Sequence, residues 1–167
     1  MGLQHQYARN SLWASYSAGQ VEYSFPTLES AAFPASHDQT HEFKVVESVR
    51  LAARWSVGSA WVVASGRPET PAEGVESVWF PTGESIYQVA FEEKNSSRLP
   101  VYHRLDLSTQ FDVKLGAFGA QLGATAFNVY DRKNISFRQY EAASTSLTTK
   151  DITLMGRAVN IFVRFGF

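Results

Sequence analysis

The regular alternation of apolar and polar residues in the last eleven positions is the sequence feature that most constrains the fold. The apolar side chains there share one parity, and they are Val159, Ile161, Val163, Phe165 and Phe167. The other parity is mostly polar, with Phe162 as an apolar exception among Asn160, Arg164 and Gly166. Successive side chains of a β-strand point to opposite faces, so this pattern predicts an amphipathic strand running to Phe167.

Similar alternation recurs upstream and predicts about six strands, all antiparallel. The expected strands lie at about Tyr7–Phe25, His41–Trp55, Ala60–Ser65, Tyr102–Lys114, Phe118–Tyr130 with an extension toward Tyr140, and from after Lys150 to Phe167. The fourth of these is the most regular. An irregularity is expected at Asp131–Lys133.

The links between the expected strands alternate between long and short. Tight turns are predicted at Ser56–Ser59 and Leu115–Ala117, whereas Gly66–Pro100, rich in Pro and Gly, is expected to be irregular. Long loops are also expected at Pro26–Thr40 and Glu141–Lys150. Short turns at one rim and long loops at the other are typical of transmembrane β-barrels, with short periplasmic turns and longer extracellular loops.

Composition bounds the class of protein without identifying it. The chain has 167 residues, a net charge of −1 and no cysteine, and 14% of its residues are aromatic. This length suits one domain, residues 1–167, and the absence of cysteine suits passage through an oxidising compartment. The aromatic content fits interfacial girdles, and no apolar run approaches the roughly 18 residues of a transmembrane helix.

Two groups of polar residues are candidates for a site. His37 and His41, beside Asp38 and Glu42, could hold a metal on a helix, but they precede a strand, so we expect them to structure a loop. A second group lines one face of a strand, either toward a lumen or as the solvated face of an ordinary sheet. Its members are Arg104, Asp106, Gln110, Asp112 and Lys114.

No constellation for chemistry is recognised. Gly116, Gly119 and Gly123 do not have the spacing of a phosphate-binding loop. We therefore predict that the chain is not an enzyme and has no catalytic residue, cofactor or bound metal. Nucleic-acid binding is not expected either, since no dense basic patch with stacking aromatics is seen among Arg9, Arg50 and Arg54.

Several stretches, in order along most of residues 7–167, resemble the C-terminal part of a TonB-dependent outer-membrane receptor. They are HDQTHE at His37–Glu42, ASGRP at Ala64–Pro68, RLPVYHRLDL at Arg98–Leu107, FNVYDRKN at Phe127–Asn134, and the closing strand Arg157–Phe167. This resemblance implies a bacterial outer-membrane location and a share in the uptake of a siderophore, cobalamin or saccharide type of solute. The family's barrel has 22 strands and is filled by an N-terminal plug.

Neither a plug nor a TonB box is seen in the sequence, so the resemblance implies the C-terminal wall of such a barrel and not a transporter that works alone. About six open strands would leave two edges with unsatisfied backbone groups, which lipid does not tolerate. The implied partners are the rest of the barrel, the plug, TonB through that plug, outer-membrane lipid and the assembly machinery.

The sequence leaves two interpretations open, and they differ in where they place the aromatic residues. In a membrane wall, Trp13, Trp55, Phe165 and Phe167 are expected to form interfacial girdles. The alternative is a soluble β-sandwich or small barrel that binds a ligand or a protein. It predicts one shared buried core containing Leu105, Leu107, Phe111, Val163 and Phe165.

Overall fold

The computed structural model describes residues 1–27, 31–115, 118–144 and 146–166. Within these ranges the chain forms fifteen β-strands and no helix, and every strand pairing is antiparallel. The prediction of an all-β antiparallel fold is therefore confirmed. The expected number of about six strands is too small, because segments predicted to be loops also form strands.

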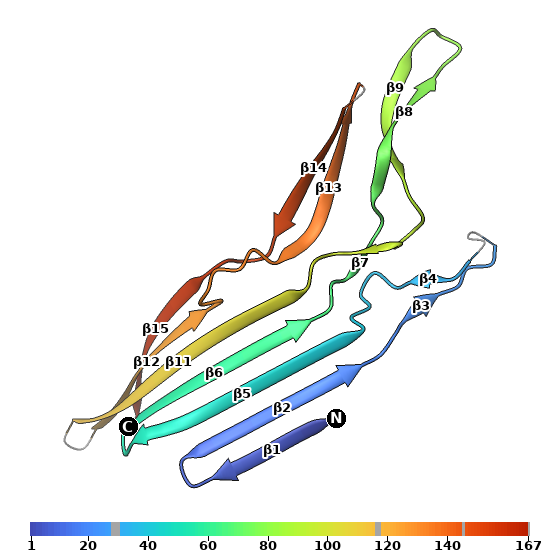
Figure 1. Ribbon diagram of the computed structural model, residues 1–167. Coiled ribbons are helices and arrows are strands. Elements are labelled where there is room, and N and C mark those ends of the chain that lie inside the picture. The colour runs from blue at the N-terminus through green and yellow to red at the C-terminus, as the bar shows by residue number, and fades with distance from the viewer. Residues whose placement is uncertain (28–30, 116–117, 145, 167) are drawn as a thin grey trace.

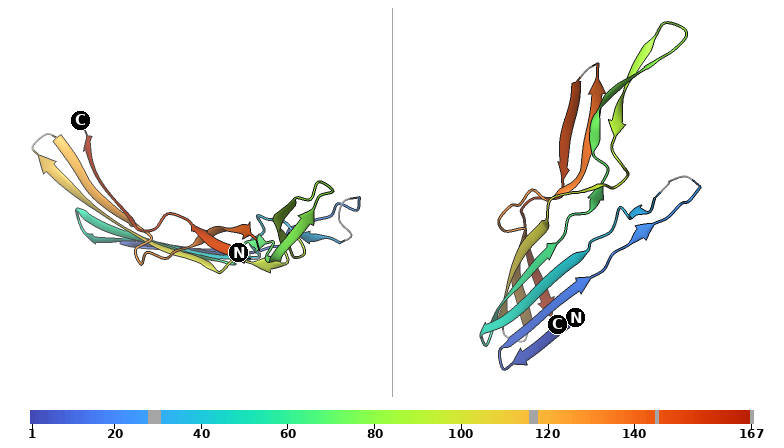
Figure 2. Two further views of the ribbon diagram at one scale, coloured as in Figure 1. Left: turned by 90° about the horizontal axis from the view of Figure 1, so that it is seen from above. Right: turned by 45° about the vertical axis from the view of Figure 1, so that its right-hand side comes forward.

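Seven strands of the described residues form one large sheet (Figure 1). In spatial order they are β1 (Gly2–Tyr7), β2 (Asn10–Ala18), β5 (His41–Ala52), β6 (Trp55–Ala64), β11 (Tyr102–Leu115), β12 (Phe118–Phe127) and β15 (Ala158–Gly166). We call the end of the sheet at the short turns after β1 and β5 the turn end, and the opposite end the outer end. The sheet curves along its length and is not closed into a barrel (Figure 2).

The remaining strands form hairpins and short ladders at the outer end (Figure 1). They are β3 (Glu22–Tyr23) with β4 (Phe33–Pro34), β7 (Pro68–Glu69) with β10 (Ser97–Arg98), β8 (Ala72–Trp79) with β9 (Ser85–Phe91), and β13 (Ile135–Ala143) with β14 (Ser146–Thr153). The long hairpins β8–β9 and β13–β14 extend beyond the sheet. The chain thus has short connections at one end of the sheet and long extensions at the other.

These hairpins correct the predicted loops. Gly66–Pro100, expected to be irregular, contains β7 to β10, with Gly83 at φ +90° in the tip of the β8–β9 hairpin. Glu141–Lys150, expected to be a loop, forms the end of the β13–β14 hairpin. In Gly66–Pro100, proline and glycine interrupt the sequence at the turns and conceal the short alternating runs between them.

The predicted turn at Ser56–Ser59 is also wrong, because these residues lie inside β6 and the chain turns at Ala53–Arg54. Gly58 has a packing role instead. A Cβ atom at Gly58 would lie 2.8 Å from the Ser108 hydroxyl on the neighbouring strand. The predicted turn at Leu115–Ala117 falls partly on residues 116–117, outside the described residues.

The large sheet is a single layer with little core. Among the described residues the buried apolar side chains are few, namely Phe33, Ala35, Ala64, Leu99 and Ala120. Four polar residues are also buried, and they lie at the outer end, where the chain leaves the sheet or joins the hairpins: Asp38, Asn95, Asn128 and Asn134. Buried polar groups and most of the few buried apolar side chains therefore occur together at the outer end.

Candidate functional site

One face of the large sheet is mostly apolar, although Glu47, Ser59 and Thr109 also lie on it. Residues directly opposite each other in antiparallel strands share a face, so the register joins Val45 to Trp61, Trp61 to Leu105, and Leu122 to Val163. These side chains are not covered: Leu107 is 42% exposed, Val163 is 53% exposed and Ile161 is 77% exposed. An apolar surface of this extent marks a site of contact with a protein or a membrane.

The described residues do not form the buried core that a soluble sandwich requires. Leu107, Phe111, Val163 and Phe165 are all more than 40% exposed, and together with Leu105 they lie on the same open face. They do not converge from two packed sheets. The apolar face therefore needs a covering that the described residues do not supply.

Aromatic side chains lie at two levels of the apolar face. Toward the turn end, Trp55 pairs with Phe111, and the Trp55 indole donates to the Thr109 hydroxyl at 2.8 Å. Toward the outer end, the rings of Phe43 and Trp61 meet edge to face, with centroids 6.1 Å apart. Trp55 and Trp61 are six residues apart on one strand, which corresponds to about 20 Å.

The expected girdle residues divide between the two faces. Trp55 and Phe165 lie on the apolar face toward the turn end, as a girdle requires. Trp13 instead pairs with Gln4 and Val46 on the opposite face, between Ser11 and Ser15, so its assignment to the girdle is corrected. Phe167 lies outside the described residues.

The opposite, polar face carries the second predicted group. Arg104, Asp106, Gln110, Asp112 and Lys114 lie on this face, as their shared parity along β11 requires. In its outer half the charges are paired: Lys44 lies 2.7 Å from Glu42, and Arg104 lies 3.0 Å from Asp106. The Arg104 guanidinium also lies 4.0 Å from the centre of the Phe127 ring.

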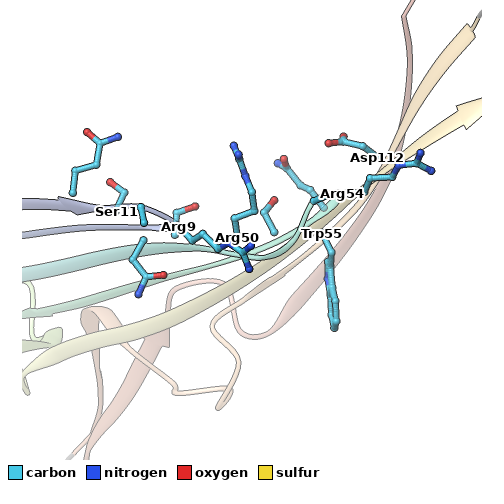
Figure 3. A pocket seen from close by; sticks show the side chains of 13 residues that line it. Arg9, Ser11, Arg50, Arg54, Trp55 and Asp112 are labelled. Carbon is cyan, nitrogen blue, oxygen red and sulfur yellow. The ribbon is translucent and has the colours of Figure 1, made fainter.

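At the turn end of the polar face there is a cavity of about 350 Å³ (Figure 3). Its lining includes Arg9, Arg50, Arg54 and Asp112, with Ser11, Ser48, Ser56 and Gln110 around them. Asp112 projects to one side of the sheet and Trp55 to the other (Figure 3). Sequence reasoning saw no basic patch here, because two hairpin turns bring together arginines that are far apart in the chain.

Asp38 is the centre of a buried network at the outer end. It is 2% exposed and accepts hydrogen bonds from the Val21 amide at 2.9 Å, the Thr40 hydroxyl at 3.0 Å and the Arg98 guanidinium at 2.6 Å. The hydrogen bond from Arg98 is the main reason that the pKa of Asp38 lies below its ordinary value, although burial acts in the opposite direction. Asp38 therefore joins three separate segments of the outer end.

The neighbouring histidines do not converge on a common point. His41 Nδ1 lies 2.8 Å from the Tyr16 hydroxyl, whereas His37 Nδ1 lies 3.5 Å from the Tyr23 hydroxyl. The described part of the chain contains no group of three or more His, Cys, Asp or Glu residues that could hold a metal ion. The absence of a metal and of catalysis remains a prediction.

A second polar network occupies the predicted irregularity after β12. Asn128 is fully buried, its amide donates to Asp106 at 2.8 Å and its side chain donates to the Arg132 carbonyl at 3.0 Å. Asn134 exchanges hydrogen bonds with the backbone of His103, at 3.1 and 2.9 Å. These contacts separate β12 from β13, so the expected extension of one strand toward Tyr140 does not form.

The two long hairpins meet at their base around a cavity of about 470 Å³. Arg138 on β13 binds Glu69 at 2.6 Å and Asp151 at 3.0 Å, and the rings of Phe91 and Tyr140 contact each other edge to face. Glu69, Arg138 and both aromatic rings line the cavity, whereas Asp151 is not part of its lining. Sequence reasoning did not foresee this cavity, because the hairpins that form it lie largely in segments expected to be loops.

Comparisons with known proteins return nothing: no protein-family model, no curated protein and no solved structure matches the chain. Among the described residues no helix has the length and apolar character needed to cross a membrane. The two faces of the sheet and the hairpins at its outer end are therefore the observations on which a function can be argued.

Proposed function

We propose that this chain forms the C-terminal wall of a bacterial outer-membrane β-barrel of the TonB-dependent receptor type, which takes part in solute uptake. The uncovered apolar face of the seven-stranded sheet carries this proposal. In that role lipid covers the apolar face, and the polar face lines the lumen.

The arrangement of aromatics supports the proposal. Outer-membrane barrels have an apolar band about 25 Å tall, flanked by aromatic girdles at both interfaces. Trp55 and Trp61, about 20 Å apart along β6, lie at two levels of the apolar face with aliphatic residues of neighbouring strands between them. Their indole rings suit an interface, since one edge is apolar and the N–H group needs a polar partner.

The connections support the same orientation. The turns Ala8–Arg9 and Ala53–Arg54 are two residues long, and the long hairpins β8–β9 and β13–β14 stand at the opposite end. In outer-membrane barrels the short turns face the periplasm and the long loops face outward. In this proposal the outer hairpins, with the cavity at their base, capture the solute before it passes through the lumen.

The strand directions indicate what completes the wall. Neighbouring strands alternate in direction, so β1 and β15, the first and seventh in the sheet, run the same way. Joining these two edges directly, within one copy or between copies in the same membrane, would create a parallel pair. An all-antiparallel barrel needs an odd number of further strands between them, and we assign these to the rest of the receptor.

The test is the state of the purified 167-residue chain with and without detergent, followed by size-exclusion chromatography and circular dichroism. A wall with an uncovered apolar face and open edges should aggregate in plain buffer, and detergent should convert it into a β-rich, monodisperse species. A folded monodisperse monomer in plain buffer would refute the proposal and favour the soluble binding module.

The role of the hairpins has its own test in the complete receptor. Deleting the tip of β8–β9, at 80–84, should weaken solute binding while the barrel still assembles. A matched deletion in the β3–β4 connection controls for the loss of any outer segment. Solute binding that the β8–β9 deletion leaves unchanged, or that the control deletion weakens equally, would contradict the assignment of capture to these hairpins.

A further inference from the structure

The polar face carries an uneven distribution of charge between its two ends. At the turn end there are five cations, which are Arg9, Arg50, Arg54, Lys114 and Arg164. Among the described residues of this region, Asp112 is the carboxylate that lies beside them. At the outer end, by contrast, Lys44 and Arg104 each lie within 3.0 Å of a carboxylate.

The register places these cations on one surface. Arg50 pairs with Ser56, and Ser56 with Gln110, on the polar face. On the same face, Asp112 pairs with Gln121, and Gln121 pairs with Arg164. The turn residues Arg9 and Arg54 join it, because the Arg50 amide donates to the Arg9 carbonyl and the Asp112 amide to the Arg54 carbonyl, both at 2.8 Å. We call this surface the cationic rim.

The cationic rim is not neutralised within the described part of the chain. None of the ion pairs found there involves its five cations. The Asp112 carboxylate accepts a hydrogen bond from the Gln121 amide at 3.0 Å. Several like charges placed together repel one another, so an anionic partner would relieve a cost that the sheet alone carries.

We propose that the cationic rim binds an acidic polypeptide segment carrying several carboxylates. This inference rests on the proposed function, since it names a partner for the inward face of that wall. The width of the cationic rim favours an extended partner over a small anion. From β2 to β15 it crosses five strand spacings, about 24 Å, which is far wider than a single phosphate or carboxylate.

The position of the rim also distinguishes a polypeptide from lipid. Trp55, on the apolar face, projects away from the side on which Asp112 lies (Figure 3). Acyl chains that cover the apolar face leave their headgroups beyond its edge, whereas the rim lies on the concave, polar side. An extended acidic segment can lie across the strands there, and arginine binds carboxylates in a bidentate fashion.

The test uses the full chain in non-ionic detergent micelles and a fluorescein-labelled twelve-residue peptide of alternating Glu and Ser, followed by fluorescence anisotropy. The variant is Arg9→Gln/Arg50→Gln/Arg54→Gln. The control removes three cations from the outer end, as Arg67→Gln/Lys150→Gln/Arg157→Gln. A second variant, Lys114→Gln/Arg164→Gln, tests the rim on its other strands, and circular dichroism checks that each protein is folded.

The expected result is that wild type and control bind the peptide alike and that the triple arginine variant binds at least about tenfold more weakly. Binding should weaken as salt rises, because these charges are exposed. The inference would be overturned if the control weakened binding equally, or if both rim variants bound the peptide as wild type does. It would also be overturned if inorganic phosphate or anionic phospholipid, added at equal charge, displaced the peptide. If the chain folds in micelles but does not bind the peptide, only this inference is contradicted. If the chain is a folded monomer in plain buffer, the proposed function is contradicted.

Discussion

The Arg98 guanidinium lies 2.6 Å from the Asp38 carboxylate and so connects the ladder β7–β10 to the segment before β5. Arg98 also donates to the Gly66 carbonyl at 3.0 Å, where a Cβ atom would overlap the Leu99 carbonyl. Gly66 is thus required for the close approach of two chain segments. Arg98 therefore links three segments of the outer end through Asp38 and Gly66.

Replacing Asp38 by Asn should lower the free energy of unfolding in detergent by about 1–3 kcal/mol, since buried hydrogen bonds to a charged group are lost. The loss should be near the lower value if the Arg98 guanidinium, whose side chain is 36% exposed, forms hydrogen bonds to water in place of those to Asp38. Urea unfolding followed by tryptophan fluorescence measures the change. Glu141→Gln, an exposed carboxylate on β13, is the control and should be neutral; equal losses in the two variants would contradict this role of Asp38.

The pH dependence of stability should differ between wild type and Asp38→Asn. The pKa of Asp38 in the folded state lies below its ordinary value of 3.8, mainly because of the hydrogen bond from Arg98. Its stabilising contribution is therefore complete above the unfolded-state pKa, and it is lost as the pH falls through the folded-state pKa. The difference in unfolding free energy between the two proteins should be constant at neutral pH and should begin to narrow as the pH falls below about 4. A difference that stays constant with pH would contradict this assignment.

Gly123 and Phe162 are directly paired on the polar face, and a Cβ atom at Gly123 would overlap the Phe162 ring. Gly123→Ala should destabilise the sheet by about 1–3 kcal/mol through overpacking. Gly119→Ala on the same strand is the matched control, because nothing lies within 4 Å of its added Cβ. Adding Phe162→Ala should remove most of the Gly123→Ala penalty, and a double-mutant cycle measures this coupling. Additive effects would show that the ring does not cover the glycine.

Glu47 occupies the apolar face in the middle of β5, opposite Leu12 and Ser59. If lipid covers this face, Glu47→Val should raise the free energy of unfolding in vesicles by about 1–2 kcal/mol, since acidic residues cost less there than the ~2–4 kcal/mol of Arg or Lys. Ser48→Val, on the polar face next to it, should give no such gain. A gain from Ser48→Val and none from Glu47→Val would place lipid on the wrong face.

Sequence reasoning recovered the strands whose alternation is long and regular. Tyr102–Lys114 differs by one residue from β11, and the last strand reaches Gly166. It missed β1, because the first strand was expected to begin only at Tyr7, where the structure has the end of β1. It also missed β8, β9 and β14, because the outer hairpins lack a buried face that would impose a clear period. The exceptional Phe162 on the polar parity is explained by Gly123, which leaves the space that the ring fills.

The candidate site was less predictable than the fold. The polar parity of Arg104 to Lys114 could be seen in the sequence, because it depends on alternation alone. The cationic rim could not, since it depends on which turns meet and on the register that aligns Asp112 with Gln121 and Gln121 with Arg164. The sequence indicated that Asp38 belongs to a loop-structuring group, but not that it binds Arg98, because Arg98 lies in a segment expected to be irregular.

The most direct test of the membrane-wall proposal is the quenching of single tryptophans by brominated lipids, with the other tryptophans replaced by Phe. Trp55 and Trp61 lie on the apolar face and Trp13 on the polar face. The account predicts strong quenching of Trp55 and Trp61 in vesicles and little quenching of Trp13. Equal quenching of all three, or none, would contradict a wall whose apolar face contacts lipid.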